Sequence, residues 1–265
     1  MAIVTVSRGT YSGGRALAEC LSDALEYRLL SREQLVTSAA KEFGASEDDL
    51  ESALVHRPKF LEGKLTKLHY VYCVQATLAK AVQGDNVVYH GQAGHLLLTG
   101  VLHHLRLRVV ADLEYRIAAA RRRSHLPRDK AIAMIRELDR GRDEWVKWVY
   151  GVDRNDPATY DLEINLERIP LDHACLTVEE LIKRDFQTTP ASQKILDDLV
   201  LASEVRARIG LAPDIVDDRI EVEASDGVVT ITGTVRSGGD VEKVQALVER
   251  LPGVRRADMQ LGTRW

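Results

Sequence analysis

The first 25 residues constrain the fold more than any other part of the chain. A short, apolar and β-branched run, Ala2–Val6, predicts a buried strand. A glycine-rich loop follows over residues 7–14, and apolar side chains then recur at helical spacing as far as Leu25. Strand, glycine loop and helix in this order begin a βαβ unit. The rest of the chain is therefore expected to supply further parallel strands and the helices that cover them.

Later segments fit this α/β architecture. Residues 31–84 are predicted to be mainly helical, and the helix over residues 65–82 is apolar on most of its surface, so we expect it to be buried on more than one side. Two further buried strands are predicted, at residues 86–89 and 105–111. Strands that alternate with helices favour a parallel sheet flanked by helices on both faces.

The pattern changes near residues 187–190. A helix is predicted from Ser192 to about Ile209, and two alternating runs around Asp226-Gly227 predict a β-hairpin. A helix over residues 239–251 and a last strand over 254–261 complete a small α+β unit of the order αββαβ. We therefore expect two domains, 1–187 and 190–265, of which the second folds separately.

Composition narrows the class of protein. The net charge of −4 argues against a protein that binds nucleic acid through surplus cations. No apolar run approaches the ~20 residues that span a bilayer, and the N-terminal residues lack the pattern of a signal peptide, so we expect a cytoplasmic protein without a transmembrane segment.

Cys20, Cys73 and Cys175 lie far apart without a CxxC motif, which predicts reduced core residues. The eight histidines show no metal-ligand spacing, so no metal site of Cys and His is expected.

The glycine loop carries the first indication of chemistry. Gly9-Thr-Tyr-Ser-Gly-Gly14-Arg15-Ala16 lies on the phosphate-binding frame G-x-x-x-x-G-K-[ST], with Arg15 in place of lysine and Ala16 in place of the hydroxyl residue. Glycines let backbone N–H groups point at a phosphate, and the following helix adds its positive end. Arginine binds phosphate oxygens through its planar fork, whereas alanine cannot coordinate Mg²⁺. The alternative is a plain glycine turn, but its place between strand and helix favours phosphate binding.

Several motifs together resemble a known family. Residues 3–8, Ser12-Gly-Gly-Arg15 and Arg32-Glu33 resemble the start of the cytidylate-kinase-like family, a branch of the P-loop nucleoside monophosphate kinases. That branch commonly has Ser-Gly-Gly-Arg in its phosphate loop, so Arg15 fits it. Further matches at residues 105–117, 139–142 and 160–165 occur in the order of the family, and the resemblance extends over about residues 1–187.

The resemblance implies a kinase with three parts: a core that holds ATP, a helical insert that binds the nucleoside monophosphate, and a lid that carries arginines. The implied cofactors are ATP and Mg²⁺, and the implied partner is a small phosphate-bearing acceptor. ATP would lie on Gly9, Ser12, Gly13, Gly14, Arg15 and Ala16. The implied catalytic residues are Arg15, Arg140 and Arg142, and those for the acceptor are Arg32, Gln92 and Arg116. Phosphoryl transfer needs alignment and charge neutralisation, which arginines supply without losing their proton.

Two departures from the family leave a second hypothesis open. Gln92 stands where the family usually has an arginine, and Ser31 stands where it usually has an aspartate. Glutamine can hydrogen-bond a phosphate but cannot neutralise it. Together with Ala16, these changes reduce the acceptor and metal sites. The alternative is a non-catalytic nucleotide-binding or scaffolding protein that acts through its C-terminal domain.

The C-terminal unit resembles a BON domain, through Ile220-Glu-Val, residues 226–235 and Leu251-Pro-Gly-Val254. The resemblance implies a lipid or protein partner, since BON domains are associated with phospholipid surfaces and with other proteins. The residues from 190 onward include 10 Lys+Arg and 13 Asp+Glu. This acidic balance does not favour binding to an anionic bilayer.

A few side chains allow both a functional and a structural interpretation. Asp139 could assist a metal, but we favour pairing with the nearby lid arginines. Asp112 is expected to cap a helix, and Trp145 and Trp148 are expected to pack rather than cover a base. The basic run 121–123 is expected to be a solvated helix face rather than a nucleic-acid patch.

Overall fold

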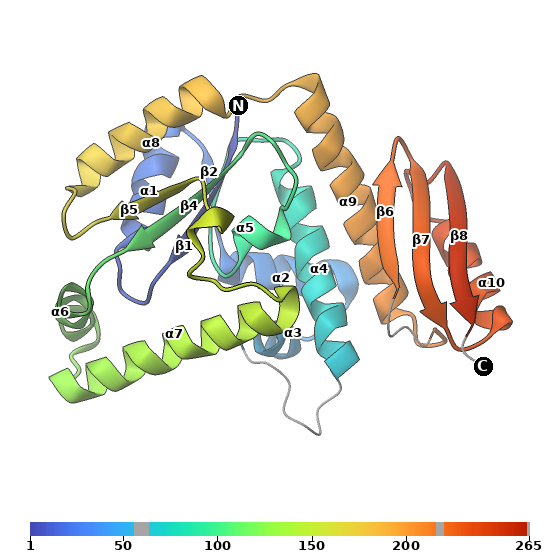
Figure 1. Cartoon of the computed structure of the whole chain (residues 1–265), viewed down its shortest axis with the longest axis horizontal. Coiled ribbons are helices and arrows are strands. Elements are labelled where there is room, and N and C mark those ends of the chain that lie inside the picture. The colour runs from blue at the N-terminus through green and yellow to red at the C-terminus, as the bar shows by residue number, and fades with distance from the viewer. Residues whose placement is uncertain (56–63, 216–219, 264–265) are drawn as a thin grey trace. The chain divides into compact units, whose positions relative to one another are not determined.

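A computed structural model describes residues 1–55, 64–215 and 220–263 (Figure 1). Its contacts divide these residues into two compact units. Unit 1 comprises Met1–Gln34, Gly84–Thr189 and the described residues of Leu54–Arg57. Unit 2 comprises Leu35–Ala53 and the described residues of Pro58–Gln83 and Pro190–Trp265. Most of the helical insert therefore groups with the C-terminal part of the chain.

Unit 1 is built on a parallel five-stranded sheet with the order β2-β3-β1-β4-β5. The strands are β1 (Ile3–Arg8), β2 (Arg28–Ser31), β3 (Val87–His90), β4 (His104–Val110) and β5 (Leu162–Asn165). The central strand β1 pairs with β3 on one side and with β4 on the other. Because all strands run in the same direction, their carboxyl ends and the loops that follow share one edge, where ligands of such sheets bind.

Helices complete unit 1. α1 (Gly14–Leu25) and α8 (Leu171–Asp185) contribute to one apolar core with the strands, which includes Leu17, Leu21 and Val178. The short α5 (Gly94–Leu97) contacts β1 and β4. α6 (Leu113–Ser124) and α7 (Arg128–Tyr150) pack on each other through a small core of their own, and a 3₁₀ turn covers Pro157–Thr159.

The predicted parallel sheet is confirmed, and the three predicted strands correspond to β1, β3 and β4. The outer strands β2 and β5 were not predicted from the sequence pattern. Each has four residues, of which only Leu30 in β2 and Ile164 in β5 are buried. Such short, half-exposed edge strands lack the apolar run by which a buried strand is recognised.

Unit 2 contains most of α2 (Arg32–Phe43) and α3 (Glu47–Val55), together with α4 (Lys64–Val82) and α9 (Pro190–Leu211). It also contains the mixed sheet β6-β7-β8, made of Glu221–Ser225, Val228–Val235 and Arg256–Thr263, and α10 (Gly238–Val248). β6 and β7 are antiparallel, and β7 and β8 are parallel. The order αββαβ is as predicted, and the described part of the region 31–84 is mainly helical, as predicted. Residues 56–63 of it lie outside the described residues.

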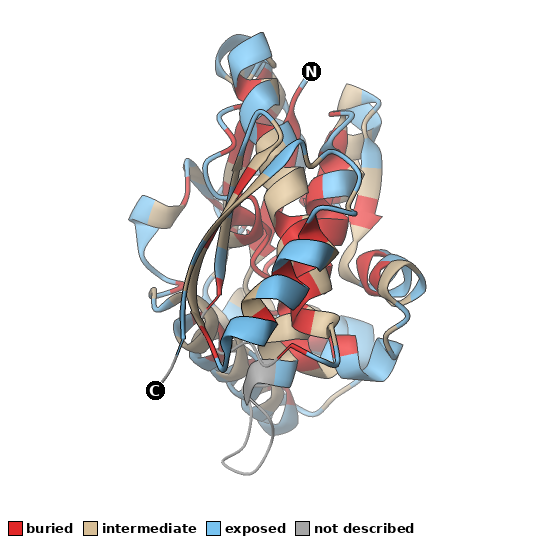
Figure 2. Ribbon diagram, turned by 90° about the vertical axis from the view of Figure 1, so that its right-hand side faces the viewer, coloured by how far each residue is buried: buried red, intermediate tan, exposed pale blue. Residues whose placement is uncertain are grey.

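Within unit 2, α9 lies along α4 (Figure 1). The Arg206 guanidinium lies over the Tyr72 ring, 4.0 Å from its centroid. At the other end of the pair, Gln83 Nε2 donates a 2.8 Å hydrogen bond to Asp197. Figure 2 shows buried residues where the helices face neighbouring elements and exposed residues on their outer turns. We call the described residues of 190–265 the C-terminal module. Its first helix, α9, and the helix α4 therefore form one packed body.

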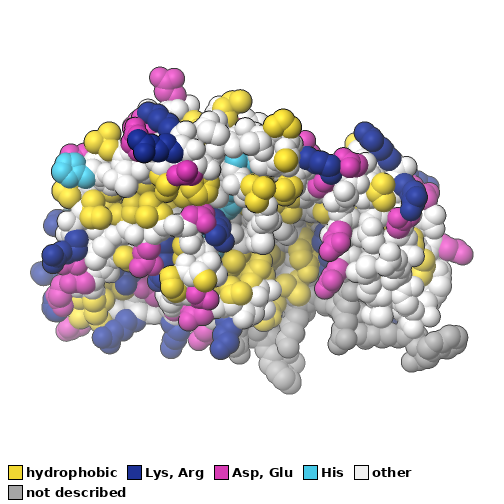
Figure 3. Space-filling view, turned by 45° about the horizontal axis from the view of Figure 1, so that its top comes forward, with side chains coloured by type: hydrophobic (Ala, Val, Ile, Leu, Met, Phe, Trp, Pro, Cys, Tyr) yellow, Lys and Arg dark blue, Asp and Glu magenta, His cyan; other side chains and the backbone are white. Residues whose placement is uncertain are grey.

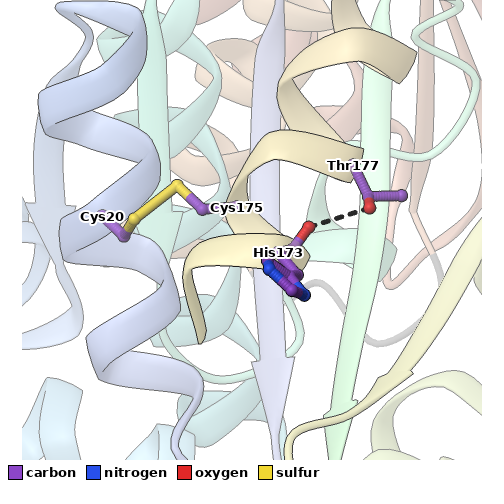
Figure 4. The surroundings of a disulfide bond; sticks show 4 residues. All are labelled: Cys20, His173, Cys175 and Thr177. Atoms are coloured by element: carbon purple, nitrogen blue, oxygen red, sulfur yellow. Dashed lines mark hydrogen bonds between the residues drawn. A yellow bond between two sulfur atoms is a disulfide. The ribbon is translucent and has the colours of Figure 1, made fainter. Parts of the chain in front are cut away.

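The expectation of three reduced cysteines is wrong for two of them. Cys20 on α1 and Cys175 on α8 form a disulfide, with 6.3 Å between their Cα atoms (Figure 4). Beside this bond, Thr177 Oγ1 donates a 2.8 Å hydrogen bond to the His173 carbonyl. The two cysteines are 155 residues apart, and only the packing of α1 against α8 brings them together. Cys73 is free and buried, as expected.

The exposed surface mixes charges of both signs. On the face shown in Figure 3, Lys and Arg side chains are interspersed with Asp and Glu, and hydrophobic side chains lie between them. The most exposed large hydrophobic residues include Leu102 and Leu176. In the part of the chain that the structure describes, every helix is too short or too polar to cross a membrane.

Candidate functional site

The loop between β1 and α1 forms a cradle of backbone amides. Tyr11 and Gly13 have positive φ angles, 62° and 92°, which turn the chain sharply before the helix. A Cβ at Gly13 would lie 2.9 Å from Leu166 Cδ1, so a side chain does not fit there. The first helical hydrogen bond of α1 runs from Leu17 N–H to Gly13 O, at 3.2 Å. The amides of residues 13–16 therefore remain available to a bound anion, whereas those of Gly9 and Ser12 already donate to Val109 O and Gly9 O.

A hollow of about 690 Å³ opens over this cradle, and we call it the P-loop hollow. Its lining comes from residues 8–16, Glu19, α6 and α7, and includes all six residues predicted to hold ATP. Arg15 is half exposed, and its Nε donates a 2.7 Å hydrogen bond to Glu19, which raises the pKa of Arg15. The Ser12 hydroxyl donates to Gly9 O at 3.0 Å, inside the loop. The P-loop hollow thus offers backbone amides and a guanidinium to a ligand.

The lid helices hold the loop through Thr10. Its backbone N–H and its hydroxyl both donate to Asp139 Oδ1, at 3.1 and 2.7 Å. Arg116 donates to Thr10 O and pairs with Asp139, while Arg142 Nη1 donates to Thr10 Oγ1 at 2.8 Å. Burial raises the pKa of Asp139, but the bonds from Arg116 and Thr10 outweigh it and lower the pKa overall. Of the two predicted lid arginines, Arg142 pairs with Asp139, at 3.6 Å. The other partner of Asp139 is Arg116, which was predicted at the acceptor site.

A second, smaller hollow of about 90 Å³ lies at the same edge of the sheet, and we call it the arginine hollow. It is lined by Ser7, Arg8, Arg32, Glu33, Gly91, Gln92, Ala93, Arg142, Val146 and Arg154. Gln92 is buried, and its Nε2 has no hydrogen-bond partner in the described part of the chain. Burial lowers the pKa of Arg142 to about 10, although Asp139 opposes this. Four guanidiniums and one carboxylate give this hollow an excess of positive charge.

The structure brings some of the predicted residues together and separates others. Arg32 and Gln92, both predicted to bind the acceptor, line the arginine hollow. Arg142 lines both hollows. Arg116 instead lines a third hollow of about 240 Å³, next to Arg108 and away from Arg32. Arg140 is exposed on α7 and lines none of the three hollows.

Two arginines of the site were missed by the sequence reasoning. Arg8 is the last residue of β1, and it lines both hollows. Its position at the carboxyl end of a central parallel strand was a usable signal. Arg154 follows α7 and lines the arginine hollow, where its Nε donates a 2.6 Å hydrogen bond to Asp143. Nothing in its sequence neighbourhood distinguishes it from a solvated loop residue.

The described residues around the P-loop hollow hold no preformed cage of metal ligands. Ala16 lines the P-loop hollow without an oxygen atom, and the Ser12 hydroxyl is directed at Gly9 O. Asp139 is bound by two arginines and by Thr10. Among residues 1–55, 64–215 and 220–263, no group of three His, Cys, Asp or Glu could hold a metal ion. Magnesium that enters with the nucleotide belongs to the substrate.

The structural interpretations of Asp112 and Trp145 are confirmed. The Asp112 carboxylate accepts a 2.9 Å hydrogen bond from Tyr115 N–H and caps α6. Trp145 is fully buried in α7. His104 is also buried, and its Nε2 lies 2.7 Å from Thr5 Oγ1. These residues support the site without lining it.

A parallel sheet of this order, with a glycine loop and a helix after its central strand, defines a P-loop kinase-like fold. Residues 3–168 match the cytidylate kinase-like family, and the chain belongs to this family. Residues 197–261 match the BON domain.

Similar proteins agree with this assignment. The cytidylate kinase of Methanosarcina acetivorans is 28% identical over 166 residues, which cover 62% of this chain and 87% of that protein. The osmotically-inducible protein Y of Escherichia coli is 35% identical over 68 residues, which are 25% of this chain and 33% of that protein. A solved structure of an uncharacterized protein from Eubacterium ventriosum covers 69% of this chain and 99% of its own, with 15% identity and a TM-score of 0.53. The fold and the kinase relationship are thus established independently of the loop geometry.

Proposed function

We propose that the chain is an ATP-dependent phosphotransferase that transfers the γ-phosphate of ATP to a nucleoside monophosphate or a related small acceptor. The observation that carries this proposal is the pair of hollows at one edge of the sheet. The P-loop hollow has the volume and the amide cradle for a nucleoside triphosphate. The adjacent arginine hollow has the charge for a phosphate-bearing acceptor. Membership of the cytidylate kinase-like family supports the same reading.

The reaction follows from the charges of the site. An oxygen of the acceptor phosphate attacks the γ-phosphorus, and the bond from that phosphorus to the bridging oxygen breaks as ADP leaves. Arg15 binds the phosphates from the cradle, and Arg142 approaches the transferred group from α7. Fixed guanidiniums neutralise charge without reorganising, which is how a phosphoryl-transfer site lowers its barrier. Magnesium bound to ATP adds positive charge at the β- and γ-phosphates when the nucleotide binds.

The direct test is a coupled assay of ADP formation with MgATP and a panel of nucleoside monophosphates. We expect turnover with at least one pyrimidine monophosphate. Arg15→Ala should weaken ATP binding about tenfold or more, because a charge-assisted hydrogen bond contributes roughly 1.5–3 kcal/mol. Isothermal titration with ATP measures this loss in the absence of any acceptor.

The matched control is Arg136→Ala, which removes an exposed arginine of α7 that lines neither hollow. This variant should bind ATP and turn over as the wild type does. Unchanged ATP affinity in Arg15→Ala contradicts the cradle assignment. ATP binding without transfer to any acceptor of the panel contradicts the phosphotransferase and favours a nucleotide-binding or scaffolding protein.

A further inference from the structure

Arg8 stands at the boundary between the two hollows. It is the last residue of β1 and lines both the P-loop hollow and the arginine hollow. Arg142 is the other residue common to both linings, and it is already bound to Thr10. By contrast, the Arg8 guanidinium makes no hydrogen bond or ion pair with any residue that the structure describes. The Arg8 guanidinium is therefore a cation without a partner among the described residues, at the boundary of the two hollows.

This arrangement is unfavourable for the protein alone. Burial lowers the pKa of Arg8, and the positive charges of Arg15, Arg123 and Arg32 lower it further. Glu33 is the opposing charge, and it does not come within ion-pair distance. A partly buried cation among other cations costs stability unless an anion joins it. The position of Arg8 therefore suits the binding of an anion.

Gly14 provides the room for this side chain. A Cβ at residue 14 would lie 2.6 Å from Arg8 Cβ and 3.2 Å from Arg8 Cδ. Gly14 is also the first residue of α1, so Arg8 passes directly over the start of the helix. The glycine of the phosphate loop therefore serves two purposes: it shapes the cradle, and it lets the arginine reach the positive end of α1.

We propose that Arg8 is a catalytic residue that binds the phosphoryl group during its transfer, between the nucleotide on the cradle and the acceptor in the arginine hollow. This inference rests on the proposed function and adds to it the residue that contacts the moving group. In the step, a bond forms between an acceptor oxygen and the γ-phosphorus, and the bond from phosphorus to the leaving ADP oxygen breaks. Arg8 keeps its proton and donates hydrogen bonds to the equatorial oxygens of the phosphoryl group.

The first test compares ATP with ADP, because only ATP carries the group that Arg8 contacts. In Arg8→Met, we expect the ATP dissociation constant to rise about tenfold or more, as for a lost charge-assisted hydrogen bond, and the ADP constant to change less than about twofold. Arg8→Lys should recover part of the ATP affinity, since it keeps the charge but not the fork. Arg136→Met is the matched control and should alter neither constant. Equal ATP affinity in Arg8→Met and wild type overturns the assignment.

A stability measurement separates this role from a structural one. Because Arg8 is an unpaired cation among cations, the ligand-free Arg8→Met protein should melt at the wild-type temperature or above it. An arginine that holds the fold together would lower the melting temperature when it is removed. One combination of results overturns the proposal. In it, Arg8→Met melts at a lower temperature than wild type, and Arg8→Lys equals wild type in both melting temperature and ATP affinity.

The turnover assay then distinguishes this inference from the proposed function. With an acceptor that the wild type uses, Arg8→Met should lose at least about 100-fold in kcat, the usual loss when one hydrogen-bond donor to the charge of the transition state is removed. Wild-type turnover in Arg8→Met overturns the inference and leaves the proposed function intact. If the wild type binds ATP but transfers nothing, the proposed function fails, and the ATP-against-ADP comparison still decides whether Arg8 binds the terminal phosphate. If the wild type binds neither nucleotide, both proposals fail.

Discussion

Unit 1 and the C-terminal module of unit 2 bury different kinds of side chain. The core of the C-terminal module is mainly apolar, with Val229, Ile231 and Val244 fully buried in it. Its described residues also bury three polar side chains, Ser192, Ser203 and Asp240. In unit 1 an apolar core lies beside many buried polar residues: Thr5, Ser7, Thr10, Ser12, Asp85, His90, Gln92, His95, His103, His104 and Arg154. Buried polar groups cost stability unless they are paired. Their concentration in unit 1 marks the part of the molecule that is shaped for a ligand.

This difference in buried side chains predicts which changes destabilise each region. Ser7, Gln92 and Arg154 line the arginine hollow, and Thr10 and Ser12 line the P-loop hollow. Unit 1 should therefore lose stability through its polar groups and its disulfide, whereas the C-terminal module should lose it mainly through its apolar core. Hydrogen exchange resolves the two regions peptide by peptide, so each can be followed in the intact chain.

The largest expected effect is the loss of the disulfide between α1 and α8. Cys175→Ser should lower the free energy of unfolding of unit 1 by about 4 kcal/mol, since a cross-link between residues 155 apart restricts the unfolded chain strongly. Hydrogen exchange should quicken in α1 and α8 and change little in β6–β8. The measurement is urea unfolding combined with exchange, for protein kept under oxidising conditions.

Reduction provides the control for this prediction. A thiol reductant should reproduce the effect in wild type and should have none in Cys175→Ser, since Cys73 is free already. Equal loss of protection in β6–β8 would show that the two regions do not respond separately. Equal stability of oxidised and reduced wild type would show that the disulfide contributes nothing.

A core substitution in the C-terminal module should destabilise that module and leave unit 1 unaffected. Ile231 lies in β7 and is fully buried, opposite Val222 of β6 and Met259 of β8. Ile231→Ala should cost about 3 kcal/mol, within the usual range for removing a large buried aliphatic side chain. Exchange should quicken in β6–β8, while the ATP dissociation constant stays within about twofold of the wild-type value.

The matched control is Ile195→Ala on α9, where the isoleucine is 37% exposed. A surface change of this kind is expected to cost less than about 1 kcal/mol. If Ile231→Ala weakens ATP binding more than Ile195→Ala does, the core of the C-terminal module is coupled to the cradle. The contrast drawn between the two regions would then be wrong.

Local patterns allowed much of the fold to be predicted. The order of β1, glycine loop and α1 and the hairpin at Asp226-Gly227 each depend on neighbouring residues, and both were predicted correctly. The residues quoted for the phosphate loop all line one hollow. A resemblance to a known family extended the prediction to Arg32 and Gln92, which no local pattern would have placed in the arginine hollow.

The features that were missed depend on contacts between distant segments. The disulfide needs α1 beside α8, and Arg154 reaches the arginine hollow only because the chain after α7 returns to it. The role inferred for Arg8 needs both hollows to be seen at once. A sequence states which residues are charged or apolar, but whether a cation has a partner is a property of the folded chain.

The smallest expected effect is the response to pH, and it arises from buried histidines of unit 1. Burial lowers the pKa of His95 to about 3 and that of His104 to about 4, from the usual value of 6.5. Around His95, the charges of His104, Arg106, Arg154 and Arg108 act in the same direction. Around His104, Arg106 and His103 lower the pKa, whereas Asp161 and a hydrogen bond to Leu98 oppose them. Both side chains are therefore neutral in the folded protein throughout the neutral range.

The sign of the effect follows from proton binding. Below pH 6.5 the unfolded chain takes up protons on these histidines and the folded chain does not, so the stability falls as the pH decreases. Each histidine should cost about 1 kcal/mol per pH unit between pH 6 and pH 5, which urea unfolding at half-unit steps can measure. His104→Gln should remove the share of this slope that belongs to His104, and His125→Gln and His173→Gln, which remove exposed rings, are the matched controls. Residues 190–265 contain no histidine. Hydrogen exchange in β6–β8, corrected for the intrinsic exchange rate, should therefore change less over this pH range than hydrogen exchange in β1 and β4. An equal change in both sheets would contradict the comparison.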